Sequence, residues 1–424
     1  KHVSQAIPFH TLSSHQTALR ACRMNICDAL LVAILLGVAH SCGSGKPCPF
    51  EIDLDEPPEQ RWVEVATAYK DVIPAMCVAL DGLLQDGQIT NATRDQYIRH
   101  SSIPAEYLAE LSGIVKTVDH ALVTLDRLIL FQMLYELHLT SPSEKSSLKA
   151  SSGIVAADDS GLVLHGRNFD SNFFFVGRGR AMGLEDVTLD LTWKRNGSKL
   201  FTSVNTVGQI GVHTGMTLGG SPWSAQQNLR WEDESASFAE ASTAARESRT
   251  ETAESLEAGG KIHMTLIRSL MESQLSFKDA VLRLERSRMA ARQYLVLAGS
   301  HPWDGAVIAC DRASHENSMN NVQVLSQEIG RWFLVQANDD IWAETEDLRR
   351  PDAVNLISGL GQHGMTVESM VTSMRTYPTF AFNTVFTWVA IPATGERHIY
   401  MGSEAAGDVA GLSRKSSSLS RLRV

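Results

Sequence analysis

The feature that most constrains the fold is a change of hydrophobic period near residue 150. Before it, residues 56–140 place apolar side chains at three-to-four spacing, with Pro and Gly at the edges of the runs, which predicts amphipathic helices. From residue 153 the apolar residues come in short runs separated by turn sequences such as "DDSG", "RNGS" and "PATGE", which predicts strands. A polar, Ser-rich connector, "TSPSEKSSLKASS", joins the two regions.

The strands come in blocks. We expect them at 153–157, 162–166, 186–193, 199–204, 209–215, 294–298, 306–310, 331–337, 381–391 and 397–401. Between the strands at 209–215 and 294–298 lies a helical insert, which begins with the acidic segment 232–258. A further helix follows Thr366. Ser276 and Asp279 are a predicted capping pair for the last helix of the insert. This order favours an α+β fold with two antiparallel sheets between helical layers over an alternating parallel fold.

The first Met is Met24, and we interpret residues 1–23 as an upstream or non-native segment. Residues 24–41 contain an apolar run from Ala29 to Ala39 followed by the small residues of a cleavage site, which predicts a secretory signal peptide. The run is too short to span a bilayer, which takes about 20 residues. At the other end, residues 403–424 are basic, Ser-rich and free of acidic residues after Asp408, which predicts a disordered tail.

The cysteines and sequons fit a secretory route. Cys42 and Cys48 are expected to form a disulfide loop in an oxidising compartment, and no Cys/His spacing suggests zinc. The sequons at Asn91 and Asn196 are predicted glycosylation sites. Asn196-Gly197 also predicts a two-residue hairpin turn, where a glycan would be exposed.

Charge and motifs exclude several classes of protein. A formal net charge of −10 argues against a nucleic-acid partner, since phosphate binding needs clustered Lys and Arg. The commonest nucleotide, zinc-protease and α/β-hydrolase motifs do not occur in the sequence, and we expect no cofactor. A small-molecule or lipid substrate is the expected partner.

The stretch "KASSGIVAADDSGLVLHGRNFD", residues 149–170, predicts a hairpin whose open end carries side chains that could take part in catalysis. A four-residue loop "DDSG" sets Ser152 opposite Arg167 and Ser151 opposite Asn168. A buried Arg and Asp170 are costly unless they pair or take part in chemistry. The arrangement fits either an Arg–Asp pair that closes a hairpin or a nucleophile, Ser151 or Ser152, whose freed α-amine is its own base.

The sequence "GIVAADDSGLVLHGRNFD", followed by "NGSKLFTSVNTVGQIGVHTG", "YLVLAGSHPWDGAVIACDR", "GRWFLVQANDDIW" and "LRRPDAVN", resembles the acid ceramidase and N-acylethanolamine-hydrolysing acid amidase family. The resemblance runs in order from "FEIDLDEPPEQRW" to Tyr400. It implies an N-terminal-nucleophile hydrolase, related to choloylglycine hydrolases, with a four-layer αββα core at residues 151–402 and a helical, α-subunit-like region at 42–150. It further implies self-cleavage into an α/β heterodimer and a lysosomal or secreted location.

The resemblance also implies a reaction and a site. The reaction is hydrolysis of an N-acyl lipid amide, a ceramide or an N-acylethanolamine, to fatty acid and amine, with peripheral contact to membranes or lipid vesicles. Arg167 and Asp170 match the residues that hold and activate the nucleophile and its amine. Asn338 matches the asparagine that helps to bind the oxyanion. Arg349 matches a second arginine of the site, and Arg350 stays open because the spacing from Asn338 is shorter than in the family.

Two departures from the family set the alternatives. The family's nucleophile is a Cys, and this chain has Ser151 there, or Ser141 in another alignment, because the link from Tyr135 is longer. A serine enzyme, a catalytically impaired lipid-binding relative and an error in the gene sequence all fit. The second departure is the polar insert at 232–258, which is apolar in the family. A bile-salt or penicillin-acylase type of amidase fits the secretory signal and the helical N-terminal region less well.

Overall fold

The computed structural model describes residues 46–86, 89–137, 151–230, 238–312, 321–342 and 347–403. All of them belong to one compact unit, residues 42–424. The predicted upstream segment, the signal peptide and almost all of the predicted tail lie outside the described residues. Within the described ranges, no helix combines the length and the apolar character that a membrane crossing requires.

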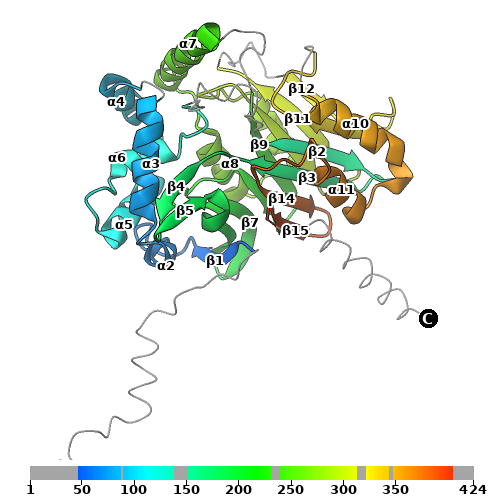
Figure 1. Cartoon of the computed structure of the whole chain (residues 1–424). Helices are drawn as coiled ribbons and strands as arrows, with labels where there is room; N and C mark the ends of the chain where they lie inside the picture. The colour runs from blue at the N-terminus through cyan, green and yellow to red at the C-terminus, as the bar shows by residue number, and fades with distance from the viewer. Residues whose placement is uncertain are drawn as a thin grey trace, which may run out of the picture. The chain divides into compact units, whose positions relative to one another are not determined.

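The larger sheet has eight strands in the order β1-β6-β7-β8-β9-β10-β11-β12 (Figure 1). Their bounds are β1 Cys48–Asp53, β6 Thr188–Arg195, β7 Ser198–Thr206, β8 Thr214–Thr217, β9 Trp223–Leu229, β10 Gln293–Gly299, β11 Gly305–Cys310 and β12 Asn321–Val324. Its pairs are antiparallel apart from β1 and β6, which run parallel. The prediction of antiparallel sheets was therefore wrong at this edge, where β1 pairs with the otherwise free edge of β6.

The smaller sheet has five strands in the order β13-β2-β3-β14-β15, all antiparallel. Their bounds are β2 Ser152–Ala157, β3 Val163–Asp170, β13 Phe333–Gln336, β14 Thr384–Ile391 and β15 Glu396–Met401. A separate two-stranded hairpin, β4 Phe174–Gly177 with β5 Arg180–Gly183, follows β3. Strands β2 and β3, two neighbouring interior strands of the smaller sheet, belong to the hairpin at which the nucleophile was predicted.

The two sheets pack face to face between helices. Along β2, Val155 joins an apolar cluster between the sheets, whereas its neighbour Ile154 joins a cluster under α10 and α11. Along β10, Val296 faces the smaller sheet, whereas Leu295 faces the outer helices. This alternation is the period of two of a strand that is buried on both faces. The predicted αββα order of layers is confirmed (Figure 1).

Apart from α10, which was not predicted, the helices follow the predicted segments. Those of the outer layers are α8 His263–Glu272, α9 Phe277–Glu285, α10 Arg349–Leu360 and α11 Val367–Met374. Ser276 accepts from the backbone N–H of Asp279 at 3.2 Å, which confirms the predicted capping pair. The N-terminal region forms α2 Val63–Ala68, α3 Ile73–Asp86, α4 Asn91–His100, α5 Ala105–Val118 and α6 Leu125–Phe131, and the insert forms α7 Phe238–Glu257.

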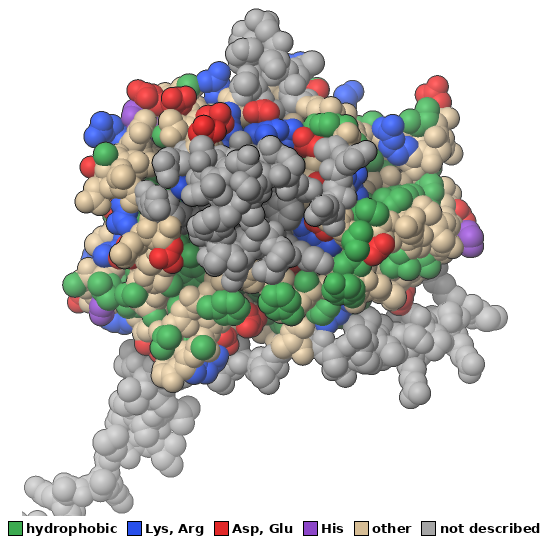
Figure 2. All heavy atoms as spheres, turned by 45° about the horizontal axis from the view of Figure 1, so that its top comes forward, with side chains coloured by type: hydrophobic (Ala, Val, Ile, Leu, Met, Phe, Trp, Pro, Cys, Tyr) green, Lys and Arg blue, Asp and Glu red, His purple; other side chains and the backbone are tan. Residues whose placement is uncertain are grey.

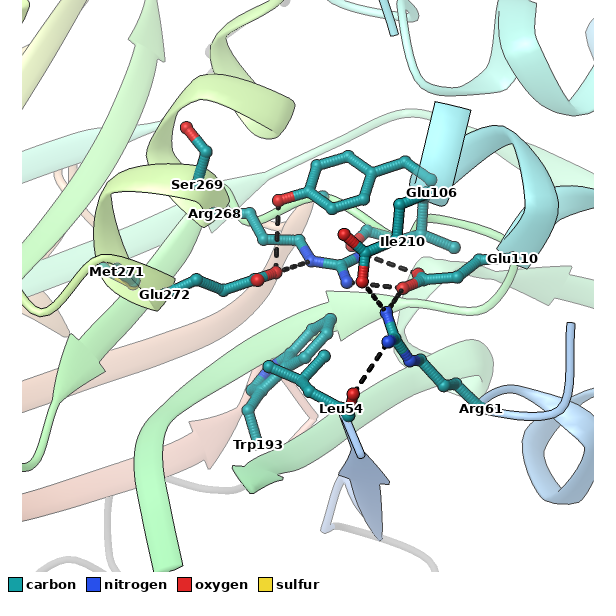
Figure 3. Close-up of polar contacts among 12 residues, drawn as sticks. Leu54, Arg61, Glu106, Glu110, Trp193, Ile210, Arg268, Ser269, Met271 and Glu272 are labelled. Atoms are coloured by element: carbon teal, nitrogen blue, oxygen red, sulfur yellow. Dashed lines mark hydrogen bonds and ion pairs between the residues drawn. The ribbon is translucent and has the colours of Figure 1, made fainter. Parts of the chain in front are cut away.

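The N-terminal helices and the αββα layers share a buried ion-pair network (Figure 3). Arg268 of α8 donates to both carboxylate oxygens of Glu110 on α5, at 2.6 Å each, and to Glu272 at 2.8 Å. Glu110 also accepts from Arg61 at 2.9 Å and from the indole N–H of Trp62 at 2.8 Å. Because a buried charge is costly when its partner is missing, this network strongly favours the docked arrangement of the two regions.

The described cysteines comprise one in a disulfide and two free thiols. Cys48 is disulfide-bonded, and its predicted partner, Cys42, lies outside the described residues. Cys77 on α3 and Cys310 on β11 are free and buried. Burial raises the pKa of both thiols, that of Cys77 to about 11, so both are protonated and poor nucleophiles at neutral pH.

Candidate active site

The β2–β3 hairpin has a register one residue away from the predicted one. Ser152 pairs with Asn168 and Gly153 with Arg167, so the prediction of Ser152 opposite Arg167 was wrong. The reason is the turn. Gly161, at φ +85°, donates to the carbonyl of Asp158 at 2.9 Å, and the N–H of Asp158 donates to the carbonyl of Leu162 at 2.9 Å. This three-residue loop with a glycine bulge replaces the predicted four-residue loop.

The corrected register decides between the two serines. Ser151 directly precedes β2, and its Oγ accepts from Nη2 of Arg167 at 3.2 Å on the side that faces the other sheet. Ser152 lies on the opposite face, on the same side as Asn168, and its buried Oγ has no hydrogen-bond partner in the described residues. Ser151 is itself almost fully buried. The structure thus brings Ser151 rather than Ser152 to Arg167, whereas Ser141 lies outside the described residues.

Arg167 is held rigidly behind Ser151. Its Nη1 donates to the backbone carbonyl of His213 at 2.7 Å and to the hydroxyl of Thr214 at 2.5 Å. Its guanidinium carbon lies 5.0 Å above the ring centre of Phe169, a cation–π contact. Burial lowers the pKa of Arg167 to about 10, so the side chain stays charged at neutral and acidic pH.

Asp170 ends β3 and is fully enclosed. Its Oδ1 accepts from the hydroxyl of Thr384 at 2.7 Å, and its Oδ2 lies 3.6 Å from Nη1 of Arg349. Burial raises the pKa of Asp170 to about 6, although the Arg349 guanidinium, the Thr384 hydroxyl and Arg167 each act to lower it. The carboxyl group therefore changes its charge in mildly acidic solution.

The structure places Arg349 at the site and Arg350 away from it. Arg349 begins α10; its Nη1 donates to the carbonyl of Ser151 at 3.3 Å and its Nη2 to Oδ1 of Asn338 at 2.7 Å. Asp347 forms an ion pair with the same guanidinium at 2.5 Å. The side chain of Arg350 forms an ion pair with Asp339 instead.

Asn338 completes the predicted set. It is fully buried just after β13, and its Nδ2 donates to the carbonyl of Leu229 at 2.7 Å. Because its Oδ1 accepts from Arg349, the orientation of the amide is fixed. Among the described residues, Nδ2 donates to Leu229 alone, so its second N–H is available as a preorganised donor.

Sequence reasoning missed two hydroxyl groups of the site, those of Thr214 and Thr384. Thr384 lies directly across from Asp170 in the β3–β14 pairing. The predicted strand 381–391 contains Thr384, but the local sequence does not show which residue of β3 lies opposite it. Thr214 begins β8 of the other sheet, and only the packing of the two sheets brings it to Arg167.

Both predicted glycosylation sites are exposed. Asn91 begins α4, and Asn196 lies in the turn between β6 and β7 with φ +53°. Arg195 pairs with Ser198 across that turn, which confirms the predicted two-residue hairpin. An exposed sequon is a necessary condition for glycosylation, and both sites stay predictions.

The chain is similar to N-acylethanolamine-hydrolyzing acid amidases over most of its length. A family model described as the beta subunit of N-acylethanolamine-hydrolyzing acid amidase matches residues 45–89, which precede Ser151. The chain is 27% identical to an N-acylethanolamine-hydrolyzing acid amidase of Caenorhabditis elegans, over 85% of this chain and 94% of the relative. It is 26% identical to the protein of the same name from Rattus norvegicus, over 91% and 98%.

The similarity extends to the second branch of the predicted family. An acid ceramidase of Homo sapiens is 25% identical, over 83% of this chain and 85% of the relative. Among solved structures, a Caenorhabditis elegans ortholog of N-acylethanolamine-hydrolyzing acid amidase matches with 26% identity and a TM-score of 0.48, over 57% of this chain and 93% of that chain. The resemblance predicted from the sequence motifs is confirmed by these similarities, which cover most of the chain.

Proposed function

We propose that this chain, a relative of the N-acylethanolamine-hydrolyzing acid amidases and acid ceramidases, hydrolyses the amide bond of an N-acyl lipid with Ser151 as its nucleophile. The observation that carries the proposal is the contact of the Ser151 hydroxyl with Arg167, next to a buried carboxyl group, Asp170, and a fixed amide, Asn338. The substrate class follows from the names of the relatives. Those names leave two substrate classes, a ceramide and an N-acylethanolamine.

The chemistry begins with cleavage of the peptide bond before Ser151. Ser151 has φ +30°, a backbone conformation that costs free energy for a residue other than Gly, and cleavage at this residue would relieve it. The freed α-amine then accepts the hydroxyl proton as Oγ attacks the substrate carbonyl. Arg167 and Arg349 both donate to Ser151, and their charges disfavour a protonated amine beside them. The amine therefore stays available as a base.

The second half of the reaction follows the same atoms. The C–N bond of the substrate breaks, the leaving amine takes the proton from the α-amine, and the acyl group stays on Oγ as an ester. Water then attacks the ester, gives its proton to the α-amine, and the fatty acid leaves as Oγ regains a proton. The available N–H of Asn338 is the expected donor to the oxyanion in both steps.

Exposed apolar side chains support access from a lipid surface. Phe174 and Val176 project from β4, and Phe382 precedes β14 with 85% of its surface exposed. Both segments flank Asp170, because the N–H of Ser171 donates to the carbonyl of Asn383 at 2.9 Å. Figure 2 shows hydrophobic side chains gathered on the lower and right-hand parts of one face. We propose peripheral contact with membranes or lipid vesicles through such side chains.

Processing and location are part of the same proposal. Cleavage before Ser151 would leave two chains held together by the Glu110–Arg268 network and by the β1–β6 pairing. The two exposed sequons and the disulfide-bonded Cys48 support passage through the secretory route to a lysosomal or secreted location.

The second candidate is a catalytically impaired relative that binds lipid amides without turnover. It rests on the residue at position 151, because a serine hydroxyl is a weaker nucleophile than a cysteine thiol in this type of enzyme. The two candidates differ in one measurable property, which is turnover by the unmodified chain.

The experiment compares the unmodified chain with Ser151→Cys and Ser151→Ala at mildly acidic pH. A fluorescent N-acylethanolamine and a fluorescent ceramide report turnover, and mass spectrometry reports a new N-terminus at residue 151. Cleavage and turnover by the unmodified chain, both lost in Ser151→Ala, would support a serine enzyme. An intact, inactive chain that becomes active as Ser151→Cys would instead support the impaired relative.

A further inference from the structure

A second cluster of buried polar side chains lies behind Arg167, and the reaction proposed above does not use it. The carboxylate oxygen Oε1 of Glu136 accepts from the backbone N–H of His263 at 3.0 Å and lies 2.6 Å from Nδ1 of the same residue. Glu136 and His263 are both fully buried. The two side chains therefore form a short hydrogen bond inside the core.

Tyr135 connects this pair to a second histidine. Its ring packs edge-on against both imidazoles, with ring centres 5.7 Å from His263 and 5.0 Å from His213. His213 is held on its other side by Gln209, 3.0 Å from Nε2. Burial lowers the pKa of His213 well below its usual range, so its ring is neutral and packs without an ionic partner.

The cluster reaches the site through two contacts of Arg167. The backbone carbonyl of His213 accepts from Nη1 of Arg167 at 2.7 Å. The ring of Phe169, over which the guanidinium lies, has its centre 5.6 Å from that of His213 and 6.2 Å from that of Tyr135. The Tyr135 ring therefore contacts both residues that hold the guanidinium: His213, through its backbone carbonyl, and Phe169, through the face of its ring.

We infer that Glu136 and Tyr135 are positioning residues for Arg167. The Glu136–His263 pair anchors the chain at Tyr135, and the Tyr135 ring presses His213 and Phe169 into the places from which they hold the guanidinium against Ser151. The inference rests on the proposed function for its kinetic consequence, although the geometry of Arg167 can be measured without turnover.

Tyr135 and Glu136 lie on the opposite side of the proposed cleavage point from the site residues. All five predicted site residues follow position 150, whereas Tyr135 and Glu136 precede it. After cleavage they belong to the N-terminal chain. The N-terminal chain thus helps to position Arg167, in addition to packing against the sheets.

The experiment uses the full chain and four substitutions, in the Ser151→Cys background if the unmodified chain does not turn over. Glu136→Gln replaces the carboxyl group that contacts His263 by an amide and keeps the shape. Tyr135→Leu removes the ring, and Tyr135→Phe keeps it. The matched control is Glu110→Gln, which neutralises an equally buried carboxylate whose bonds run to Arg61, Trp62 and Arg268.

Because small displacements of a catalytic group cost about tenfold to a hundredfold in rate, Glu136→Gln and Tyr135→Leu should lower kcat by about that factor with KM little changed. Tyr135→Phe should keep kcat near that of the parent, and so should Glu110→Gln at a temperature where both are folded. Combining Glu136→Gln with Arg167→Lys should cost less than the product of the two single losses. Equal losses of kcat in Glu136→Gln and Glu110→Gln, or multiplicative losses with Arg167→Lys, would overturn the inference.

A measurement independent of turnover separates this inference from the proposed function. In protein labelled with 15N-arginine, the guanidinium signals of Arg167 are identified by their loss in Arg167→Lys. They should be sharp and slow to exchange in the parent and in Tyr135→Phe, and broadened or shifted in Glu136→Gln and Tyr135→Leu. Unchanged signals in the last two variants would refute the positioning role, even for a chain that turns over no substrate.

Discussion

Replacement of Thr384 by Val should move the acid limb of the pH–rate profile toward neutral pH. Thr384 donates its hydroxyl to Oδ1 of Asp170 at 2.7 Å, deep in the site. Val keeps the branched shape and removes the donor. Because this hydrogen bond favours the ionised carboxyl, its loss raises the pKa of Asp170 above the value of about 6 that burial already imposes.

The size of the shift follows from the strength of the bond. A hydrogen bond to a charged group contributes about 1.5–3 kcal/mol, and one pKa unit corresponds to about 1.36 kcal/mol. The pKa of Asp170 should therefore rise by about one to two units, from about 6 to about 7–8. If the ionised form supports the reaction, the pH at which kcat/KM is half-maximal on the acid side moves by the same amount.

The stability of the protein gives a second readout with a definite sign. Asp170 has a folded pKa of about 6, above the ordinary value of about 3.9. Its contribution to stability is thus fully present below pH about 4 and is lost as the pH rises through about 6. In Thr384→Val this loss continues to higher pH, so the drop in Tm relative to the parent should be larger at pH 8 than at pH 5.

Thr387→Val is the matched control. Thr387 lies on the same strand, is equally buried, and donates at 2.7 Å to the neutral amide oxygen of Asn168 rather than to a carboxylate. It should leave the acid limb where it is. An acid limb that stays within about 0.3 units of the parent in Thr384→Val would refute the assignment of that limb to Asp170.

Three further outcomes follow from the same contacts. Asn338→Leu should lower kcat by about 100-fold to 1000-fold with a smaller change in KM, measured by steady-state kinetics, because it removes an oxyanion donor; an unchanged kcat would exclude that role. Arg349→Gln should lower turnover at least about tenfold more than Arg350→Gln, since only the former side chain contacts the carbonyl of Ser151; equal losses would contradict the assignment. Arg268→Met should lower the free energy of unfolding by about 3–5 kcal/mol in chemical denaturation, because it leaves Glu110 buried and under-paired; a loss below about 1 kcal/mol would show that the network contributes little.

The hairpin at 149–170 illustrates how far local sequence reaches. Its strands, its turn and the proximity of a serine to Arg167 were predicted from alternation and from "DDSG". Its register was not, because the same four letters fit a four-residue loop and a three-residue loop with a glycine bulge. A shift of one residue moves a side chain to the other face of the sheet, so it decided that Ser151, and not Ser152, meets the arginine.

The two arginines at the start of α10 show a second limit. Successive residues of a helix point about 100° apart, so Arg349 and Arg350 face different neighbours although they are adjacent in sequence. No local signal distinguishes them. The choice depends on Asn338, which follows a strand of the smaller sheet, and on the carbonyl of Ser151.

Strand β1 was missed for a related reason. The segment Cys48–Asp53 is short and precedes a region of strong helical period, and its partner, β6, lies about 140 positions later in the chain. Its pattern of alternate burial arises only when β6 is present. A short strand with a distant partner carries little local evidence of its own.

By itself, the sequence determined what is local or compositional: the helical period before residue 140, the alternating strands after 153, the turn at Asn196-Gly197, and the residue types available for chemistry. Its ordered motifs also predicted the similarity to the acid amidases and acid ceramidases. Only the tertiary structure decided which serine and which arginine form the site, and that Thr384, 214 positions from Asp170, donates a hydrogen bond to that carboxyl group. The physical reason is that register, burial and hydrogen bonding across the sheets depend on contacts between distant segments, and those contacts exist only when the layers are packed.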